Sequence, residues 1–600
     1  MPGPRSPLRA SNLARHTRDI AIGYDDAAAL AGMRFLSDFP SELRGVTQTR
    51  PTLMNPESVT APVSVNIIPW RRYLAISLLI LTLAVVVRAV GISTRSLWYD
   101  EAIAANISRG SMSETIILTR LEHSAPILHP LILFAVERVA QTPLAVRVPS
   151  LVASILAIFA LLGFTTLRSV GWKSAVIAAL MMAVAASQVR YAQEVREYSL
   201  SVLFAVALVY VYLSFSESQH EKPSSKWMCA MLFLAPCVQY GLVLLGAGTL
   251  AALWILSLAN KENKNWYRYK SLLLASIFFG CGCVLSYLLT LRYQWGGRPW
   301  YLQGSYFKPG SSSFLEFALW NSDRLVEYLL PGRAIVLICL LSSFVYLRGL
   351  IRSRKCSAIL LLTVTCFGTV LFCARFRLYP YDGVRQCLFL APVLYLFVSE
   401  TLAFSVNQIE SSPWRNAAMV VFCLGIGVCG LRQIRSFRPY DEIEDVPAML
   451  AVLHQQVKAD DYVYVYSGAV PAVDFYLQKR NERFIYGDFH REDPGDYTSE
   501  ALRQLPPDVN RFWILFSHIY RDEDAGILRS FRPDWSEHFV ASSTGSSLYL
   551  LSRETSWPYP AVGSVSQAEV STARMTTVKG TEPDPKSFLG WNLRNSRLTN

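Results

Sequence analysis

The sequence predicts an all-α polytopic membrane protein of about eleven transmembrane helices and one interfacial helix, followed by a small α/β domain. Hydrophobic residues make up 52% of the 600 residues, and the mean hydropathy is +0.27. Between Tyr73 and Gly430, apolar runs alternate with short polar breaks, whereas both ends of the chain are polar. Crossing a bilayer takes roughly 17–25 apolar residues per helix, and a helix satisfies its own backbone in lipid.

Residues 1–69 precede the first apolar run. They mix Pro, Ser, Arg and acidic residues and contain no apolar core, so they do not resemble a secretory signal. We expect a mostly disordered cytoplasmic leader. Met33 and Met54 are alternative starting residues.

The basic residues between the apolar runs predict the topology. Arg71 and Arg72 precede the first run, which places the N-terminus in the cytoplasm. Later basic clusters are expected on the same side; they are Arg168/Lys173, Lys222/Lys226, Lys261/Lys264/Arg268/Lys270 and Arg348/Arg352/Arg354/Lys355. The chain between two such clusters must then cross an even number of times. The expected spans are 73–92, 149–167, 175–189, 198–214, 227–240, 242–258, 271–291, 333–349, 357–374, 386–403 and 416–431.

Residues 126–140 are apolar but do not fit this count as a crossing. The segment contains Pro130 and ends in Glu137 and Arg138. A helix of about 14 residues is too short to span and fits an interfacial segment. We therefore expect residues 93–148 to form an outer loop of a transmembrane domain over 70–431.

The region after the last span predicts a small extracytoplasmic α/β domain over 432–555. Strand-like runs at 461–468, 511–517 and 547–553 alternate with a helix-like stretch at 446–457. Residues 556–600 are polar and rich in Pro, Ser and Thr, so we expect a disordered tail.

Charge and cysteine placement give no indication of a nucleic-acid-binding protein or of a metal site. The net charge of +12 comes from Lys and Arg between apolar runs, without a basic stripe, so nucleic acid is not an expected partner. All eleven cysteines, from Cys229 to Cys429, lie in or beside apolar runs, which suits small buried residues. No Cys/His cluster has metal-ligand spacing, so no metal site is predicted and no cofactor is firmly indicated; a divalent ion at Asp100 and Glu101 stays open.

Two outer segments place charge close to the membrane surface. Asp100 and Glu101 follow the first span, and RYAQEVREY (190–198) separates the third and fourth spans. Simpler explanations are a solvated helix cap for the acidic pair and an i,i+4 pair between Arg190 and Glu194.

The same residue types also suit transfer of a sugar from a lipid phosphate. A surface carboxylate can act as general base on an acceptor hydroxyl, and arginines can hold a phosphate. A lipid phosphate is a stable leaving group, so a single base suffices for displacement with inversion. This differs from the carboxylate pair of glycoside hydrolysis.

Three motifs carry a family resemblance. WYDEA (98–102), RVPS (147–150) and YAQEVREYSL (191–200) resemble the membrane glycosyltransferases of the C superfamily (GT-C). The similarity is to the bacterial branch related to dolichyl-phosphate-mannose–protein mannosyltransferases and to lipid A aminoarabinose and galacturonosyl transferases. It covers the chain to about residue 431.

The resemblance implies a polyprenyl-phosphate sugar as donor, an active site in the first outer loop and a bacterial inner-membrane location. Asp100 would be the general base and Glu101 a supporting carboxylate. Arg196 would hold the donor phosphate, with Arg190 and Arg147 as weaker candidates; Arg147 fits equally a snorkelling anchor. Tyr191, Glu194 and Tyr198 would line the site.

Two departures from the family pattern concern His123 and Arg385. His-Pro-Pro often opens the interfacial helix, but residues 124–126 are Ser-Ala-Pro and His123 lies one position early, so an ordinary exposed histidine is an alternative to substrate binding. In YPYDGVRQ (379–386), Arg385 could reach a lipid phosphate or anchor the interface. The aromatic loop 294–332 suits sugar stacking or an interfacial belt.

The predicted function is therefore glycosyl transfer from a polyprenyl-phosphate sugar to a lipid, glycan or protein acceptor at the outer membrane face. Alternatives are a lipid-linked sugar transporter or flippase, a surface-polysaccharide polymerase or ligase, and a non-catalytic envelope assembly protein. The notable charges lie at span ends rather than at the midplane, and no repeat is visible, which favours the enzyme over a transporter.

Overall fold

The computed structural model describes most of the chain. All described residues belong to one compact unit, residues 68–600. They are 70–122, 124–167, 169–217, 225–259, 266–294, 300–310, 313–353, 357–437, 444–477, 483–488, 494–519, 523–532, 534–553 and 563–564. The predicted leader, His123, most of the predicted tail and several basic residues (Arg168, Lys222, Lys261, Lys264, Arg354, Lys355) lie outside these ranges.

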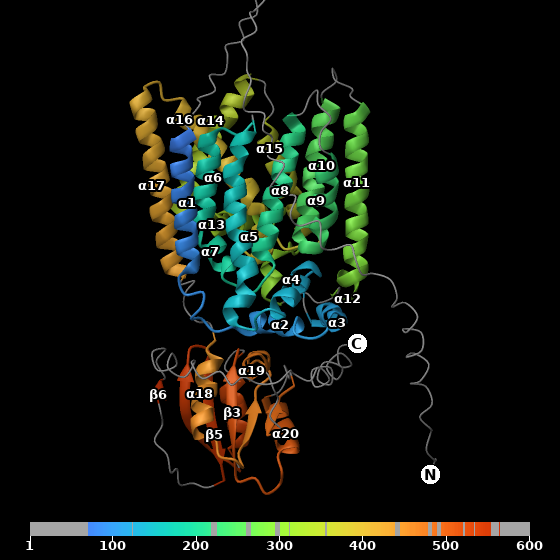
Figure 1. The fold of residues 1–600 in the computed structure, drawn as a ribbon, viewed down its shortest axis with the longest axis vertical. Helices are drawn as coiled ribbons and strands as arrows, with labels where there is room; N and C mark the ends of the chain where they lie inside the picture. Colours follow the sequence, from blue (N-terminus) through green and yellow to red (C-terminus); the bar gives the residue numbers. More distant parts are fainter. Residues whose placement is uncertain are drawn as a thin grey trace, which may run out of the picture. The chain divides into compact units, whose positions relative to one another are not determined.

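A bundle of long apolar helices forms the first part of this unit (Figure 1). Nine stretches in the described residues are helical, long enough and apolar enough to cross a membrane. Their main helices are α1 (Trp70–Ala89), α5 (Pro143–Gly163), α8 (Tyr198–Glu217), α10 (Gly241–Ala259), α11 (Trp266–Ser286), α14 (Arg333–Ser353), α15 (Ala358–Arg375), α16 (Ala391–Asn407) and α17 (Ser412–Phe437). Short pieces extend three of them: η1 (Phe164–Thr166), η2 (Tyr287–Leu291) with α12 (Arg292–Gln294), and η4 (Arg385–Leu390).

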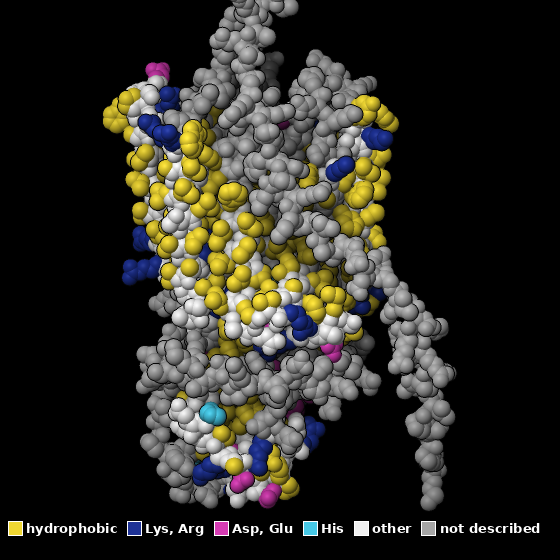
Figure 2. Space-filling view, viewed as in Figure 1, with side chains coloured by type: hydrophobic (Ala, Val, Ile, Leu, Met, Phe, Trp, Pro, Cys, Tyr) yellow, Lys and Arg dark blue, Asp and Glu magenta, His cyan; other side chains and the backbone are white. Residues whose placement is uncertain are grey.

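The outward faces of these helices are apolar. Large side chains such as Leu79, Phe159 and Phe344 are more than 60% exposed. Figure 2 shows a belt of hydrophobic side chains over much of the visible surface of the bundle, with the visible Lys and Arg side chains near the helix ends. Such a belt would be unfavourable in water and is the surface that lipid requires.

The third expected span is broken. Helices α6 (Trp172–Val184) and α7 (Ala186–Ala192) meet at 61°, because Ala185 adopts an extended conformation. The break removes helical partners from the last carbonyls of α6. The buried guanidinium of Arg88 on α1 donates to Met182 O and Ala183 O, both at 2.8 Å. An arginine inside the bundle thus satisfies backbone that lipid could not.

The expected span at 227–240 corresponds to α9 (Ser225–Val238), which has 14 residues. It packs so closely against α11 that a Cβ on Gly282 would collide with Phe233 O. Each of the eleven expected ranges therefore contains a helix, but nine, or ten with the bent pair, are long and apolar enough to span. The predicted helical bundle is confirmed, whereas eleven crossings remain a prediction.

The predicted outer loop contains α2 (Tyr99–Ile107), α3 (Met112–Glu122) and α4 (Leu128–Glu137). Figure 1 shows the three at one end of the bundle. With ten residues, α4 is too short to span, as expected for the 126–140 segment. The aromatic loop after α12 forms η3 (Trp300–Ser305) and α13 (Phe314–Leu329).

The C-terminal part is an α/β domain, as predicted. Its sheet has the order β2-β1-β3-β5-β4-β6, with β2, β1 and β3 parallel and β3, β5 and β4 antiparallel. The strands are β1 (Tyr462–Val465), β2 (Phe484–Tyr486), β3 (Arg511–Ser517), β4 (Ser536–Ser543), β5 (Ser546–Ser552) and β6 (Gly563–Ser564). The helices are α18 (Val446–Gln456), α19 (Val470–Leu477), α20 (Pro494–Gln504) and α21 (Glu523–Phe531).

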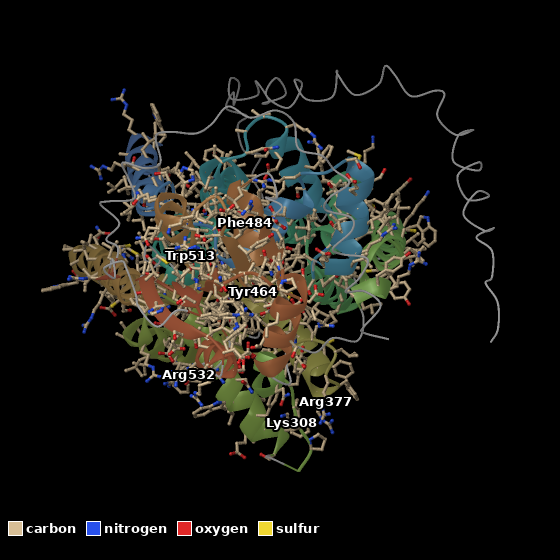
Figure 3. All side chains as sticks on the ribbon, turned by 90° about the horizontal axis from the view of Figure 1, so that it is seen from below. Lys308, Arg377, Tyr464, Phe484, Trp513 and Arg532 are labelled. Atoms are coloured by element: carbon tan, nitrogen blue, oxygen red, sulfur yellow. The ribbon has the colours of Figure 1, made fainter. Side chains whose placement is uncertain are left out.

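Helices cover both faces of this sheet. Trp513 packs on the face of α18 and α19, and Tyr464 on the face of α20 and α21. Figure 3 labels both residues with Phe484 of β2. The cluster around Trp513 continues into apolar residues of α2 and α4, including Ala102 and Leu133. The domain core is therefore continuous with the short helices of the outer loop.

Candidate active site

The acidic pair after the first span lies in the first turn of α2, where the helix dipole favours negative charge. Successive helical residues point in different directions. The Asp100 side chain is 21% exposed and lines a cavity, whereas the Glu101 side chain is fully buried. Although the two acids are adjacent in the sequence, helix geometry therefore places only Asp100 at the cavity.

Glu101 makes a buried ion pair with Arg147 on α5. Arg147 Nη2 and Nε lie 2.7 and 3.0 Å from the two carboxylate oxygens, and Val195 N–H donates to Oε1 at 2.9 Å. Burial alone would raise the pKa of Glu101, but Arg147 and Arg95 lower it below its usual value. Glu101 stays ionised and ties α2 to α5 and to the segment before α8.

Arg147 uses all five of its donors within the protein. Besides Glu101, its guanidinium donates to the carbonyl oxygens of Ile92, Arg95 and Ser96 at 2.7–3.0 Å. It is fully buried and does not line the cavity. Arg147 therefore has no N–H group left to bind a phosphate. Because its side chain is fully buried, it is not a snorkelling anchor either.

Asp100 faces two arginines across the cavity. Arg385 Nη2 lies 2.8 Å and Arg196 Nη2 3.7 Å from Asp100 Oδ2. Burial would raise the pKa of Asp100, but Arg196, Arg385 and His518 lower it below its ordinary value. The same pairing with Asp100 raises the pKa of Arg196 despite its burial. Three charged side chains from distant parts of the chain therefore share one site.

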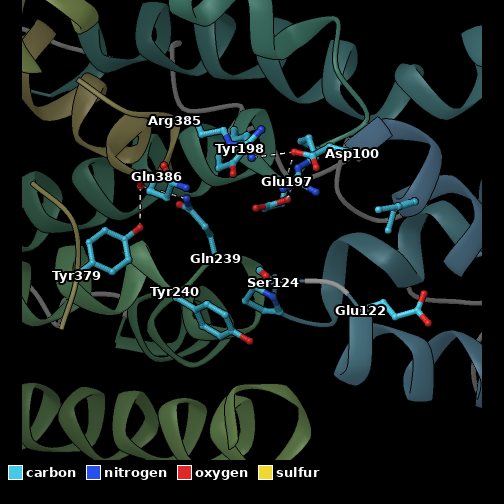
Figure 4. A pocket seen from close by; sticks show the side chains of 13 residues that line it. Asp100, Glu122, Ser124, Glu197, Tyr198, Gln239, Tyr240, Tyr379, Arg385 and Gln386 are labelled. Atoms are coloured by element: carbon cyan, nitrogen blue, oxygen red, sulfur yellow. Dashed lines mark hydrogen bonds and ion pairs between the residues drawn. The ribbon is translucent and has the colours of Figure 1, made fainter. Parts of the chain in front are cut away.

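Figure 4 shows the cavity, which has a volume of about 200 Å³. Its residues come from α2, the end of α3 and the loop after it, the segment that leads into α8, the α9–α10 turn, the loop after α15 and η4. They are Asp100, Ile103, Glu122, Ser124, Pro126, Arg196, Glu197, Tyr198, Gln239, Tyr240, Tyr379, Arg385 and Gln386. Arg385 lies 5.8 Å from the ring centroids of Trp98 and Tyr198, within cation–π range.

The remaining expected residues lie elsewhere. Arg190 Nε lies 3.0 Å from Glu194 Oε1, so these two residues form the i,i+4 ion pair that was the alternative to a role in the site. Neither residue lines the cavity. Tyr191 packs edge-on against Tyr198 at 5.1 Å, behind the cavity wall. The structure thus brings together Asp100, Arg196, Tyr198 and Arg385 and separates them from Glu101, Arg147, Arg190 and Glu194. His123 is outside the described residues.

Several cavity residues escaped sequence reasoning. Gln239 and Tyr240 are the last residues of the expected span 227–240, and nothing in their sequence surroundings indicates a site. Glu197 lies inside the recognised YAQEVREYSL motif, one position after Arg196, and only its presence beside Arg196 could have drawn attention to it. Tyr379 and Gln386 are the end residues of YPYDGVRQ (379–386), in which only Arg385 is an expected site residue.

The C-terminal domain holds the start of α2. Glu444 Oε2 accepts from Tyr99 N–H at 2.8 Å, and its Oε1 lies 2.5 Å from His518 Nδ1. The His518 ring stacks on Tyr99 with centroids 4.3 Å apart. His518 follows β3 with φ of +54°, an uncommon conformation for a residue with a side chain. The Tyr476 hydroxyl accepts a hydrogen bond from Leu97 N–H, and the Asp445 carboxylate accepts one from the Ser96 hydroxyl.

One cavity at the end of the apolar bundle thus contains a carboxylate between two arginines. No known family description and no curated protein matches the sequence. Solved structures with a similar fold exist. The crystal structure of ArnT from Cupriavidus metallidurans bound to undecaprenyl phosphate has a TM-score of 0.49 and 14% identity, over 80% of this chain and 99% of that one.

The archaeal oligosaccharyltransferase AglB from Archaeoglobus fulgidus, in complex with an inhibitory peptide and a dolichol-phosphate, has a TM-score of 0.46 and 11% identity. The similarity covers 82% of this chain and 75% of that one.

Proposed function

We propose that this protein is a membrane glycosyltransferase that moves a sugar from a polyprenyl-phosphate donor to an acceptor hydroxyl at the outer membrane face. The observation that carries the proposal is the ion pair of Asp100 with Arg385 and Arg196 inside the cavity. A base and two phosphate-binding groups are the set that this reaction needs.

The donor phosphate would bind Arg196 and Arg385. Arginines bind phosphate oxygens with charge-assisted hydrogen bonds, and both side chains are largely buried, which strengthens the interaction. Arg196 Nε has no hydrogen-bond partner among the described residues. A long lipid chain attached to that phosphate would lie against the exposed hydrophobic side chains of the bundle.

Asp100 would act as the general base. It takes the proton of the acceptor hydroxyl while the hydroxyl oxygen attacks the anomeric carbon. The bond from that carbon to the phosphate oxygen breaks, and the polyprenyl phosphate leaves as an anion held by the arginines. A single displacement inverts the anomeric configuration. In the free protein the arginines keep Asp100 a weak base; donor phosphate would share their charge and make the carboxylate more basic.

Replacing the base tests this function. In Asp100→Asn, release of polyprenyl phosphate from a short-chain polyprenyl-phosphate hexose, with membranes supplying the acceptor, should slow by roughly 100- to 10,000-fold. Binding of the donor should persist, because both arginines remain. Glu327→Gln is the matched control, since Glu327 pairs with Arg333 at the surface, away from the cavity. Unchanged transfer in Asp100→Asn would reject the assigned base.

A further inference from the structure

One wall of the cavity presents hydrogen-bond acceptors that the proposed chemistry does not use. Glu197 lines the cavity beside Arg196 and is only 3% exposed. Its Oε2 accepts no hydrogen bond within the described part of the chain, and the nearest cation given for it is Arg196 Nε at 4.0 Å. In Figure 4 its carboxylate points toward the middle of the cavity, between Asp100 and Gln239.

Two glutamines extend this wall. Gln239 is 4% exposed, and its Nε2 donates to Gln386 O at 3.3 Å. Its Oε1 and the Oε1 of Gln386 have no partner among the described residues. An amide can present either an oxygen or an NH2 group to a ligand, whereas an ionised carboxylate only accepts. Glu197 therefore determines which ligand groups this wall selects.

The neighbouring tyrosines do not supply the missing donors. Tyr379 donates its hydroxyl to Gln386 O at 2.8 Å, and Tyr240 donates to Gln294 Oε1 at 2.7 Å. A buried acceptor without a donor is costly, and more so when it is charged. The wall is therefore incomplete without a ligand that donates hydrogen bonds.

We propose that Glu197, with Gln239 and Gln386, forms a subsite for the glycosyl unit of the donor, which it binds through hydroxyl or amino substituents. The inference rests on the proposed function and extends it. The phosphate lies at Arg196 and Arg385, and the glycosyl unit is attached directly to that phosphate, so the sugar reaches the adjacent wall. The subsite accepts hydrogen bonds and thus rejects donors whose sugar lacks the matching substituent.

Two ligands separate the sugar from its phosphate. One is a short-chain polyprenyl phosphate without sugar, and the other is the same lipid bearing a hexose. With purified protein in nanodiscs, Glu197→Gln should weaken binding of the hexose-bearing lipid by roughly 10- to 100-fold, the effect of losing a charge-assisted hydrogen bond. Binding of the bare lipid phosphate should change less than about twofold, since the arginines are intact.

A lipid phosphate that bears a deoxy sugar, and two further protein variants, complete the test. Removing the recognised hydroxyl from the hexose should weaken binding to the unmodified protein, and Glu197→Gln should add little further loss with that ligand. Glu327→Gln should bind both lipids normally. Gln239→Ala, which also lines the subsite, serves if Glu197→Gln does not fold, and should show the same selective loss.

The outcomes distinguish the two proposals. Equal weakening for both lipids, or no weakening for either, would overturn the sugar subsite while leaving the phosphate site in place. If the unmodified protein binds neither lipid, the proposed function fails and the subsite fails with it.

Discussion

At the scale of single residues, adjacent carboxylates in one motif have different surroundings. Asp100 faces the cavity and two arginines, whereas Glu101 is buried against Arg147. The motif WYDEA predicts that charge gathers here, but it does not say which acid is accessible. We expect Glu101 and Arg147 to act on stability, and Asp100, Arg196 and Arg385 on ligand binding and transfer.

Arg147→Met tests this division. It leaves the Glu101 carboxylate buried beside Arg95 and Val195 N–H without its main partner, which should cost about 3–5 kcal/mol of stability. Thermal unfolding in detergent should show the loss. Arg385→Met should unfold near the temperature of the unmodified protein yet lose binding of polyprenyl phosphate.

The double variant Glu101→Gln/Arg147→Met provides the control. Removing both charges should recover part of the stability lost in Arg147→Met, because no unpaired charge remains in the interior. Normal stability of Arg147→Met together with weakened lipid binding would contradict the structural role.

At the scale of elements, two devices hold the site in place. The break between α6 and α7 is stabilised by Arg88 from α1, and Gln193 of the following segment donates to Arg88 O and Val90 O. The segment that carries Arg196 is therefore attached to the first helix. The start of α2 is held by Glu444 of the C-terminal domain.

Glu444→Ala tests whether this domain positions Asp100. The substitution removes the acceptor for Tyr99 N–H and the partner of His518. We expect the turnover rate to fall by roughly 10- to 100-fold through misplacement of the base. Affinity for bare polyprenyl phosphate should stay within about twofold, because Arg196 and Arg385 are untouched.

Two further variants define the specificity of that effect. Glu444→Gln keeps an acceptor for the backbone N–H and should recover much of the rate. Glu537→Gln, at an acid paired with Arg532 on β4, should alter neither rate nor affinity. A Glu444→Ala enzyme with normal turnover would show that the contact is not needed for positioning.

At the scale of the whole molecule, the number of crossings decides on which side of the membrane the site lies. We propose an N-terminus in the cytoplasm and both the cavity and the C-terminal domain outside. The bent α6–α7 pair and the short α9 are the elements on which that parity depends.

Alkaline phosphatase fusions measure this topology, since the enzyme is active only outside the cytoplasm. Fusions after Leu200 and Arg438 should be active, and a fusion after Lys264 should be inactive. Activity at 264 with silence at 438 would reverse the assignment and place α4 across the membrane. Expression of each fusion, checked by immunoblotting, is the control.

The sequence alone determined the helical bundle, because a run of apolar residues in lipid has to satisfy its own backbone and does so locally. It also determined the strands at 462–465, 511–517 and 546–552, which agree with the predicted runs within a few residues. The motifs indicated Asp100 and Arg196, and in the structure Arg196 Nη2 lies 3.7 Å from Asp100 Oδ2.

Only the tertiary structure decided which side chains share the cavity. Arg385 and Gln239 come from segments far along the chain and line the same cavity as Asp100. Arg147 does not take part in the site, because backbone carbonyls and Glu101 occupy all its donors. Periodicity reports on neighbours within a few residues, whereas a cavity is formed by packing between distant segments. For that reason the sequence indicated the kind of chemistry, and the fold selected the residues available to perform it.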